Sequence, residues 1–575
     1  AAFAPLALGM GAWLLSISQT KLSSVGLYGL LRSVSVWFFV GAFLVVVGFV
    51  VELARVRPRQ WVLGLHIVGL IFLIHASVPM LSHTPEYEWV YKHIGVAQTL
   101  RADGRVTDSQ NIYQEWPALF TAVGAISSEA GVGLLSIARW APLAFELLDC
   151  LMILAIFRLL TRDGRVSMLA VALFEIIASW IGQDYLSPQA FAFVLWLGFV
   201  YIVLRWLLVT GGPDGKTRGP RWFAWLRRYL TRGLDTIGPP SDTRVRAVAV
   251  IAALVVFTAI VVSHQLTPYA GLCAIGALTM LDMVRPRWLF LATTAIAVLF
   301  LIPRYGLISS QYGGIFSGFD ILQNASGVGV KASAAQAFTA DAVRLLAVGT
   351  WLSTAIVVLR ARRSAGRVIL PALLAATPFV VVVGQSYGGE AIYRVFLFSA
   401  PWCSLLLADA IYRWRSQTRR FAVTLVVMVA ALVLSLQGLY GPVAVDTFSQ
   451  AEVTGGLWLY QHSRPGSHLI MAADNFPLRD VANTQRYTVE AIPDDPQAGV
   501  GGDYLGATDL RAIDNWVAGS GKPSYLVFSR SMLTYAGFYN APRGIPMLLR
   551  KVEHTPSAWQ PIYSQGGVRI FRFIG

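Results

Sequence analysis

Long apolar runs that alternate with short basic loops constrain this chain more than any other feature. A helix that crosses the roughly 30 Å hydrocarbon layer needs about 20 mostly apolar residues, and the chain holds about 13 such runs. Of its 575 residues, 55% are hydrophobic and only 13% are charged, whereas soluble domains average about 25% charged residues. This pattern excludes an ordinary cytosolic enzyme, a disordered chain and a coiled coil, and it predicts a multi-pass α-helical membrane protein.

The predicted spans cover residues 2–19, 35–54, 60–81, 138–160, 166–182, 188–208, 246–263, 267–283, 288–303, 344–361, 368–385, 394–412 and 421–440. The chain begins inside the first of these runs. Because no cleavage-site pattern follows it, we expect a transmembrane helix there rather than a signal peptide. The three cysteines all fall inside apolar runs, so neither a disulfide framework nor a cysteine-based metal site is expected.

Arginine and lysine gather in every second loop between these spans. The basic loops are 55–59, 162–165, 209–245, 285–287, 362–367 and 413–420. The positive-inside rule assigns them to the cytoplasm, with the N-terminus inside and the C-terminus outside the plasma membrane. The net charge of +15 therefore reflects topology and contact with membrane lipid, and we expect no nucleic-acid partner. Within the longest basic loop, residues 221–232 resemble an amphipathic helix lying on the anionic inner leaflet.

The predicted outer side carries two long loops, 82–137 and 304–343, and a tail, 441–575. The tail is richer in polar and turn residues than the rest of the chain. Strands are predicted at 468–471 and 525–528, and a hairpin at 560–574 around Gly566 and Gly567. We therefore expect two N-terminal spans in 1–59, a membrane module in 60–440 and a soluble extracytoplasmic α/β domain in 441–575.

The first outer loop holds the richest set of polar side chains. Glu86 and Glu88 follow directly after a span, where a carboxylate can act as a general base toward an acceptor hydroxyl. Lys92 and His93 follow within two turns and could hold an anionic phosphate. Glu115 comes later in the same loop and is a candidate for binding acceptor or sugar. The alternative is that these residues solvate the loop while its aromatic residues anchor it at the membrane interface.

Two short outer turns provide further candidates. Asp184 lies in the turn at 182–189, where it could bind a metal ion, orient an acceptor or cap the next helix. Ser187 can supply that cap by itself, so both interpretations of Asp184 stay open. His264 and Gln265, in the turn at 263–269, can donate hydrogen bonds to sugar or phosphate. A single histidine at an interface also has an ordinary structural explanation.

Cations and one further acid are predicted at the outer ends of other spans. Arg394 lies where a span begins and Arg304 where another ends, so both could meet a lipid phosphate. Glu390 precedes Arg394 and could bind acceptor or sugar.

Acids inside the spans form a separate group. Glu146 and Asp149 share one face of a span, and Glu175 lies in the next span. Charges in lipid usually face a cavity or a partner. We expect these three acids to pair with Arg139 or to line a hydrophilic groove, rather than to act in catalysis.

The order of these loops and their motifs resembles the glycosyltransferase-C (GT-C) superfamily. The motifs are Tyr-Lys-His-Ile-Gly at 91–95, Ile-Tyr-Gln-Glu-Trp-Pro at 112–117, Asp-Tyr-Leu-Ser-Pro-Gln at 184–189 and His-Gln-Leu-Thr-Pro at 264–268. They look like those of multi-pass proteins of actinobacterial cell-envelope clusters. With 60–81 counted as the first span of the GT-C module, the seventh is 288–303, and a long outer loop follows each. Two spans preceding the module depart from the usual pattern, and the absence of an Asp-Asp or Asp-x-Asp pair leaves the base open between Glu86 and Glu88.

The resemblance implies a GT-C-like fold and transfer of a sugar from a polyprenyl-phosphate carrier at the outer membrane face, with inversion. The acceptor would be a cell-envelope glycan, a glycolipid or a protein. Glu86 or Glu88 would act as the base and Asp184 would form a second acidic site, with a divalent metal as the one cofactor to consider. Two other classes stay open: a polysaccharide polymerase or ligase, and a transporter of lipid-linked sugar.

Overall fold

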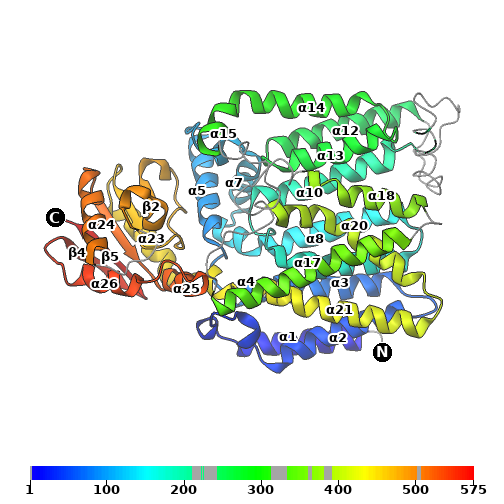
Figure 1. Cartoon of the computed structure of the whole chain (residues 1–575), viewed down its shortest axis with the longest axis horizontal. Helices are drawn as coiled ribbons and strands as arrows, with labels where there is room; N and C mark the ends of the chain where they lie inside the picture. Colours follow the sequence, from blue (N-terminus) through cyan, green and yellow to red (C-terminus); the bar gives the residue numbers. More distant parts are fainter. Residues whose placement is uncertain are drawn as a thin grey trace.

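The computed structural model describes residues 3–209, 222, 225, 242–312, 333–360, 365–380, 391–500 and 507–575. In these residues a bundle of long helices carries an α/β domain at one end (Figure 1). Helices α5 (Glu88–Asp103) and α7 (Ala118–Ala130) of the first outer loop lie between the bundle and that domain. The basic segment 221–232 falls outside the described residues, except for Trp222 and Trp225.

The bundle is built from α1 (Ala4–Gln19), α2 (Val36–Leu53), α3 (Gln60–His75), α4 (Ser77–Leu81), α8 (Leu134–Leu160), α9 (Gly164–Ala178), α10 (Pro188–Ile202), α12 (Thr243–Val261), α13 (Thr267–Met280), α14 (Trp288–Leu301), α17 (Ala334–Arg360), α18 (Ala365–Ala376), α20 (Ala391–Tyr412) and α21 (Gln417–Tyr440). Helices cover most of the described part of every predicted span. Eight helices of the described chain are long and apolar enough to cross a membrane. The multi-pass helical class is thus confirmed, and the number of crossings stays a prediction.

Helices occupy both ends of the predicted second outer loop, 304–343. Helix α15 (Tyr305–Tyr312) follows α14, and α17 already begins at Ala334, well before the predicted start at residue 344. Residues 334–343 contain five alanines, and alanine has the highest intrinsic helix propensity. The helix therefore extends beyond the predicted span 344–361, and the bounds of the outer loop stay a prediction.

Helix α9 lies at the centre of the bundle and positions the candidate site. Every residue from Val166 to Ala178 is buried, as expected for a helix that is apolar on all sides. Asp163 caps its first turn by accepting a hydrogen bond from the backbone N–H of Arg165. A short 3-10 helix, Ser179–Ile181, then leads into the loop that carries Asp184.

The C-terminal domain contains one five-stranded sheet in the order β2-β1-β3-β5-β4. Strands β1 (His468–Met471), β2 (Thr488–Ala491) and β3 (Ser524–Phe528) are parallel, whereas β4 (Trp559–Gln565) and β5 (Val568–Phe573) form an antiparallel pair. The predicted hairpin is confirmed, and Gly566 and Gly567 make its turn with φ angles of 57° and 84°. The helices of the domain are α22 (Val443–Asp446), α23 (Gln450–His462), α24 (Ala507–Gly519), α25 (Arg530–Tyr539) and α26 (Ile545–Glu553).

Contacts with α5 fix this domain against the first outer loop. The backbone N–H of Asn483 donates to Oγ1 of Thr99 over 2.8 Å. At Gly95, a Cβ atom would lie only 2.1 Å from the carbonyl oxygen of Arg479. Glycine at this position therefore allows the segment after β1 to lie directly on α5, which brings side chains of the C-terminal domain to the membrane module.

Candidate active site

His75, the last residue of α3, lies between two carboxylates. Its Nδ1 is 2.7 Å from Oδ2 of Asp184, and its Nε2 is 3.2 Å from Oε1 of Glu175. All three side chains are buried. Ser187 caps α10 by accepting a hydrogen bond from the backbone N–H of Ala190, so Asp184 is not needed as the cap. Both carboxyl groups can form a hydrogen bond with the His75 ring when the ring is doubly protonated or when one of the carboxyl groups carries a proton.

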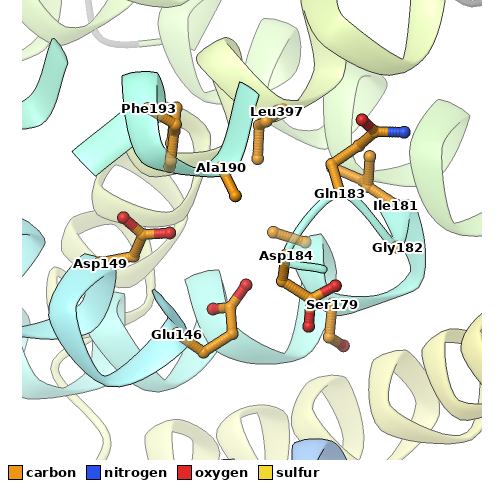
Figure 2. Close-up of a pocket in the computed structure, with 11 residues that line it drawn as sticks. Glu146, Asp149, Ser179, Ile181, Gly182, Gln183, Asp184, Ala190, Phe193 and Leu397 are labelled. Atoms are coloured by element: carbon orange, nitrogen blue, oxygen red, sulfur yellow. The ribbon is translucent and has the colours of Figure 1, made fainter. Parts of the chain in front are cut away.

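Glu146 and Asp149 of α8 extend this acidic cluster. Both line a small cavity of about 10 Å³ together with Asp184, which is space for about one water-sized occupant. Figure 2 shows the three carboxyl groups around this common space, beneath Ala190 and Phe193 of α10. Glu146 and Asp149 therefore line a small cavity rather than a groove. Arg139, the other partner expected for these acids, instead donates a hydrogen bond to the carbonyl of Pro79.

The cluster fits a divalent metal ion. His75, Glu146 and Asp184 each offer a ligand atom within 4.8 Å of the others. One imidazole nitrogen with carboxylate oxygens suits Mn²⁺, Zn²⁺ or Mg²⁺. Oε2 of Glu146 and Oδ1 of Asp149 are buried without a hydrogen-bond partner among the described residues. Because buried carboxylates need a counter-charge or a proton, these oxygens indicate a place for a cation.

An unusual turn at Tyr87 separates Glu86 from Glu88. Tyr87 has φ 67° and ψ 131°, a conformation that is rare for any residue with a Cβ atom. Its backbone N–H donates to the carbonyl of Asp446 over 2.8 Å, and its hydroxyl group contacts Gly182. The turn sends the two carboxylates to different surroundings.

Glu86 lies in the electrostatic field of the acidic cluster. Burial raises the pKa of Glu86 well above its usual value, and the charges of Asp446 and Asp184 raise this pKa further, while His75 acts in the opposite direction. Of the two glutamates proposed as the base, Glu86 is therefore the one whose titration is coupled to Asp184.

Glu88 faces the C-terminal domain instead. Its Oε1 lies 3.4 Å from Nη1 of Arg479. Burial raises the pKa of Glu88 to about 7, although Arg479 and Lys92 oppose this shift. Lys92 lies over the rings of Trp89 and Tyr113 at 4.9 and 4.8 Å. Burial and Arg479 lower the pKa of Lys92 to about 8, so this amine is still largely protonated at neutral pH.

His93 is enclosed by the first outer loop and the Asp184 loop. Its Nδ1 lies 2.7 Å from the carbonyl oxygen of Leu186, and its ring stacks on Tyr185 at 5.9 Å. Burial lowers the pKa of His93 to about 3. The His93 ring is therefore neutral at neutral pH, and its contacts link the two loops. Without a positive charge, the ring cannot attract a phosphate electrostatically.

Arg304 and Glu115 come from different outer segments and form one ion pair. Nε of Arg304 lies 2.9 Å from Oε2 of Glu115, and the guanidinium also donates to the carbonyl of Phe300 and lies 3.8 Å above that residue's ring. The two residues were assigned separate roles from the sequence. The structure brings them together, so their charges largely offset one another.

Arg394 and His264 meet at the outer end of α20. Arg394 is buried. Burial, followed by the charge of Arg394, lowers the pKa of His264 well below its usual value. Nδ1 of His264 lies 2.8 Å from Oγ1 of Thr267, and Gln265 beside it is half-buried. Glu390 lies outside the described residues.

Two residues of this site were not singled out from the sequence. His75 belongs to the predicted span 60–81, and a titratable residue within an apolar run is itself a signal of function. Arg479 follows β1 in the C-terminal domain, and no local pattern connects it with Glu88, far away in the chain. Only the packing of that domain on α5 brings the two together.

Comparison with solved structures shows the fold. The oligosaccharyltransferase of Archaeoglobus fulgidus in its apo form is similar with a TM-score of 0.52 and 12% identity, over 89% of this chain and 74% of that chain. The archaeal oligosaccharyltransferase AglB from the same organism, in complex with an inhibitory peptide and a dolichol-phosphate, gives 0.51 with the same identity and coverage. Arabinofuranosyltransferase AftD from Mycobacteria gives 0.47 at 15% identity, over 91% of this chain and 40% of that chain.

No protein-family model and no curated protein matches the chain. The likeness to the oligosaccharyltransferase, at TM-scores above 0.5, establishes that this chain has the GT-C fold, as the order of its loops predicted. At 12% identity it establishes the fold alone.

Proposed function

We propose that this chain, built on the GT-C fold, is a membrane glycosyltransferase. It would move a sugar from a polyprenyl-phosphate carrier to an acceptor hydroxyl or amide at the membrane face that bears the C-terminal domain. One observation carries the proposal: Asp184 of the loop before α10 contacts His75, and the charges of both residues act on Glu86 of the first outer loop. The structure of an oligosaccharyltransferase of similar fold contains a dolichol-phosphate, which supports a lipid-linked donor here.

The proposed reaction is a single inverting displacement. The acceptor oxygen or nitrogen forms a bond to the anomeric carbon while the bond from that carbon to the lipid phosphate breaks, and the acceptor proton passes to a carboxylate. We assign this proton to Glu86. A carboxylate with a raised pKa is a stronger proton acceptor once it is ionised, and Glu86, unlike Glu88, lies in the electrostatic field of Asp184 and His75.

A divalent metal ion at His75, Glu146 and Asp184 would supply positive charge beside Glu86 and the leaving phosphate. The protein's own part is to hold these ligands rigidly. Asp184 is held by the loop after α9, and Glu146 by α8. Positive charge at this place would also favour the ionised form of Glu86.

Cations of the first outer loop and of the outer ends of spans are candidates for binding the donor phosphate. Lys92 keeps its charge between two aromatic rings, and Arg394 brings a buried guanidinium to the outer end of α20. Arg304 is balanced by Glu115 and would need to exchange that partner for a phosphate. His264 and Gln265, close to Arg394, would donate hydrogen bonds to the sugar.

The acceptor would approach from the C-terminal domain. Glu88 and Arg479 form the contact between this domain and α5. Asp474 and Asp494 follow β1 and β2 and act electrostatically on Glu88. The carboxyl ends of parallel strands are a common place for ligands, and this edge faces the first outer loop. A glycan, a glycolipid or a protein would each present suitable groups to it.

The test is sugar transfer by the purified full-length protein in nanodiscs. Transfer should require a polyprenyl-phosphate-linked sugar and should not proceed from a soluble nucleotide sugar. Asp184→Asn should abolish transfer, whereas Asp103→Asn, which changes an exposed acid in the first outer loop, should leave it unchanged. Movement of the intact lipid-linked sugar without a new glycosidic bond would instead identify a transporter and refute the proposal.

A further inference from the structure

A second cavity lies at the end of the bundle opposite the C-terminal domain. Its volume is about 280 Å³, and it opens between the end of α2, the start of α9 and the turn from α20 to α21. In Figure 1 the end of α2 and the start of α21 lie far from the α/β domain. None of the residues that line this cavity belongs to the proposed active site.

Three arginines from three different segments line this cavity: Arg55 after α2, Arg165 in the first turn of α9 and Arg420 in the first turn of α21. Arg165 holds the site together because its Nη2 donates to the carbonyls of Arg55 and Val56 over 2.7 and 2.5 Å. Arg420 lies 5.5 Å above the ring of Tyr412. Its Nε is shielded from solvent and has no hydrogen-bond partner among the described residues.

The nearby acids do not balance these cations. Glu52 is already shared, since its Oε2 lies 3.3 Å from Arg55 and 2.6 Å from Arg59. Asp163 accepts from the first turn of α9 as its cap. Arg165 and Arg420 thus face the cavity without a carboxylate partner of their own in the described chain, an arrangement suited to a phosphate group, which accepts several charge-assisted hydrogen bonds.

The other wall of the cavity is apolar. Val50 and Leu53 belong to the last turn of α2, and Phe421 to the first turns of α21. Both helices are long and apolar enough to cross a membrane, so the cavity lies where hydrocarbon gives way to headgroups. A ligand that fits both walls carries a phosphate and an attached hydrocarbon chain.

We propose that this cavity binds the headgroup phosphate of an anionic phospholipid. The basic loops around it predict that this is the cytoplasmic leaflet, and basic pockets between membrane helices on that side are known lipid sites. The lipid would clamp the α2–α3, α8–α9 and α20–α21 loops together. This inference is independent of the proposed transferase activity.

The experiment is native mass spectrometry of the purified full-length protein titrated with phosphatidylglycerol. Arg420→Gln and Arg55→Gln should each weaken binding about fivefold, the effect of about one arginine near a lipid headgroup. Arg419→Gln and Arg57→Gln change neighbouring arginines that do not line the cavity and should have little effect. Phosphatidylcholine with the same acyl chains should bind far more weakly.

Three outcomes would overturn the proposal. Equal losses in the cavity and control variants would mean that only diffuse surface charge attracts the lipid. Displacement of phosphatidylglycerol by millimolar inorganic phosphate would indicate a site for a free anion. Unchanged binding in Arg420→Gln and Arg55→Gln would remove the cavity as the site. If Arg420→Gln does not fold, Arg420→Lys, which keeps the charge but loses the planar fork, should give a smaller loss than Arg55→Gln.

Discussion

Glu86 and Glu88 are separated by one residue, yet they lie in chemically opposite surroundings. Burial raises the pKa of both carboxyl groups. Around Glu86 the neighbouring charges are mainly acids, Asp446 and Asp184, and they add to the effect of burial. Around Glu88 the strongest neighbouring charge is that of Arg479, which opposes it. The surroundings of Glu86 thus favour binding of a cation or a proton, whereas the charge of Glu88 is already balanced by Arg479.

The different surroundings indicate a chemical role for Glu86 and a role in domain contact for Glu88. The Glu86 side contains buried carboxylate oxygens of Glu146 and Asp149 that have no hydrogen-bond partner in the described chain. The Glu88 side contains an ion pair that joins the first outer loop to the C-terminal domain. We therefore expect changes on the first side to affect rate and metal binding, and changes on the second side to affect stability and domain contact.

The largest expected effect is on the rate of sugar transfer. Glu86→Gln should lower kcat by about 10²–10⁴-fold, the usual contribution of a general base. Glu88→Gln, the matched control, should lower it by less than about tenfold. Both variants should be measured with saturating lipid-linked donor, with donor binding followed separately. A severe loss in Glu88→Gln together with near-normal transfer in Glu86→Gln would reverse the assignment.

The next effect is on stability as a function of pH. The folded pKa of Glu88, about 7, lies above the ordinary value of 4.5, so the unfolded state releases its proton at lower pH than the folded state. The higher proton affinity of Glu88 in the folded state stabilises that state by about 3 kcal/mol, calculated from the pKa difference. This stabilisation is fully present below pH 4.5 and is lost as pH rises through 7. Glu88→Gln removes the ionisation and should flatten that part of the profile.

Thermal unfolding of the detergent-solubilised protein between pH 5 and 8 measures this effect. Relative to the wild type, Glu88→Gln should gain stability as pH rises across that interval. Asp108→Asn, which changes an acid that accepts from the backbone N–H of Gln110 elsewhere in the same loop, should leave the shape of the profile unchanged. Parallel profiles for wild type and Glu88→Gln would show that Glu88 does not titrate in this window.

A smaller effect is expected on metal binding. Loss of even an outer partner of a metal ligand typically weakens metal affinity about 10–100-fold, so His75→Gln should weaken Mn²⁺ binding at least about tenfold. His66→Gln is the matched control, since His66 is a buried histidine on the same helix whose Nδ1 contacts the carbonyl of Val62. Isothermal titration with Mn²⁺ gives a readout that does not depend on activity. Equal affinities in both variants would exclude His75 as a ligand.

Local patterns were sufficient to predict much of the fold. Apolar runs marked the helices, Gly566 and Gly567 marked the hairpin turn, and Ser187 marked the cap of α10, because each depends on neighbours in sequence. The helix that contains the predicted span 344–361 begins earlier, at Ala334, because an alanine-rich segment can continue a helix beyond the apolar run that marks a span.

The candidate site was predicted only in part. Asp184 and the two loop glutamates were found because carboxylates at the outer ends of spans stand out. Which glutamate meets Asp184 depends on the backbone of Tyr87, and a positive φ angle at a non-glycine residue has no sequence signal. The ion pairs of Arg304 with Glu115 and of Arg479 with Glu88 join distant segments, so only tertiary packing reveals them.

The smallest expected effect is the coupling between each glutamate and Arg479. A double-mutant cycle of Glu88→Gln with Arg479→Gln should give a coupling of about 1 kcal/mol in unfolding free energy, because the two groups are 3.4 Å apart and mostly buried. The cycle of Glu86→Gln with Arg479→Gln should give a coupling near zero, since the charges acting on Glu86 are those of Asp446, Asp184 and His75. Equal couplings in the two cycles would mean that both glutamates share one electrostatic environment. The turn at Tyr87 would then not divide the site, and the assignment of Glu86 alone as the base would lose its structural reason.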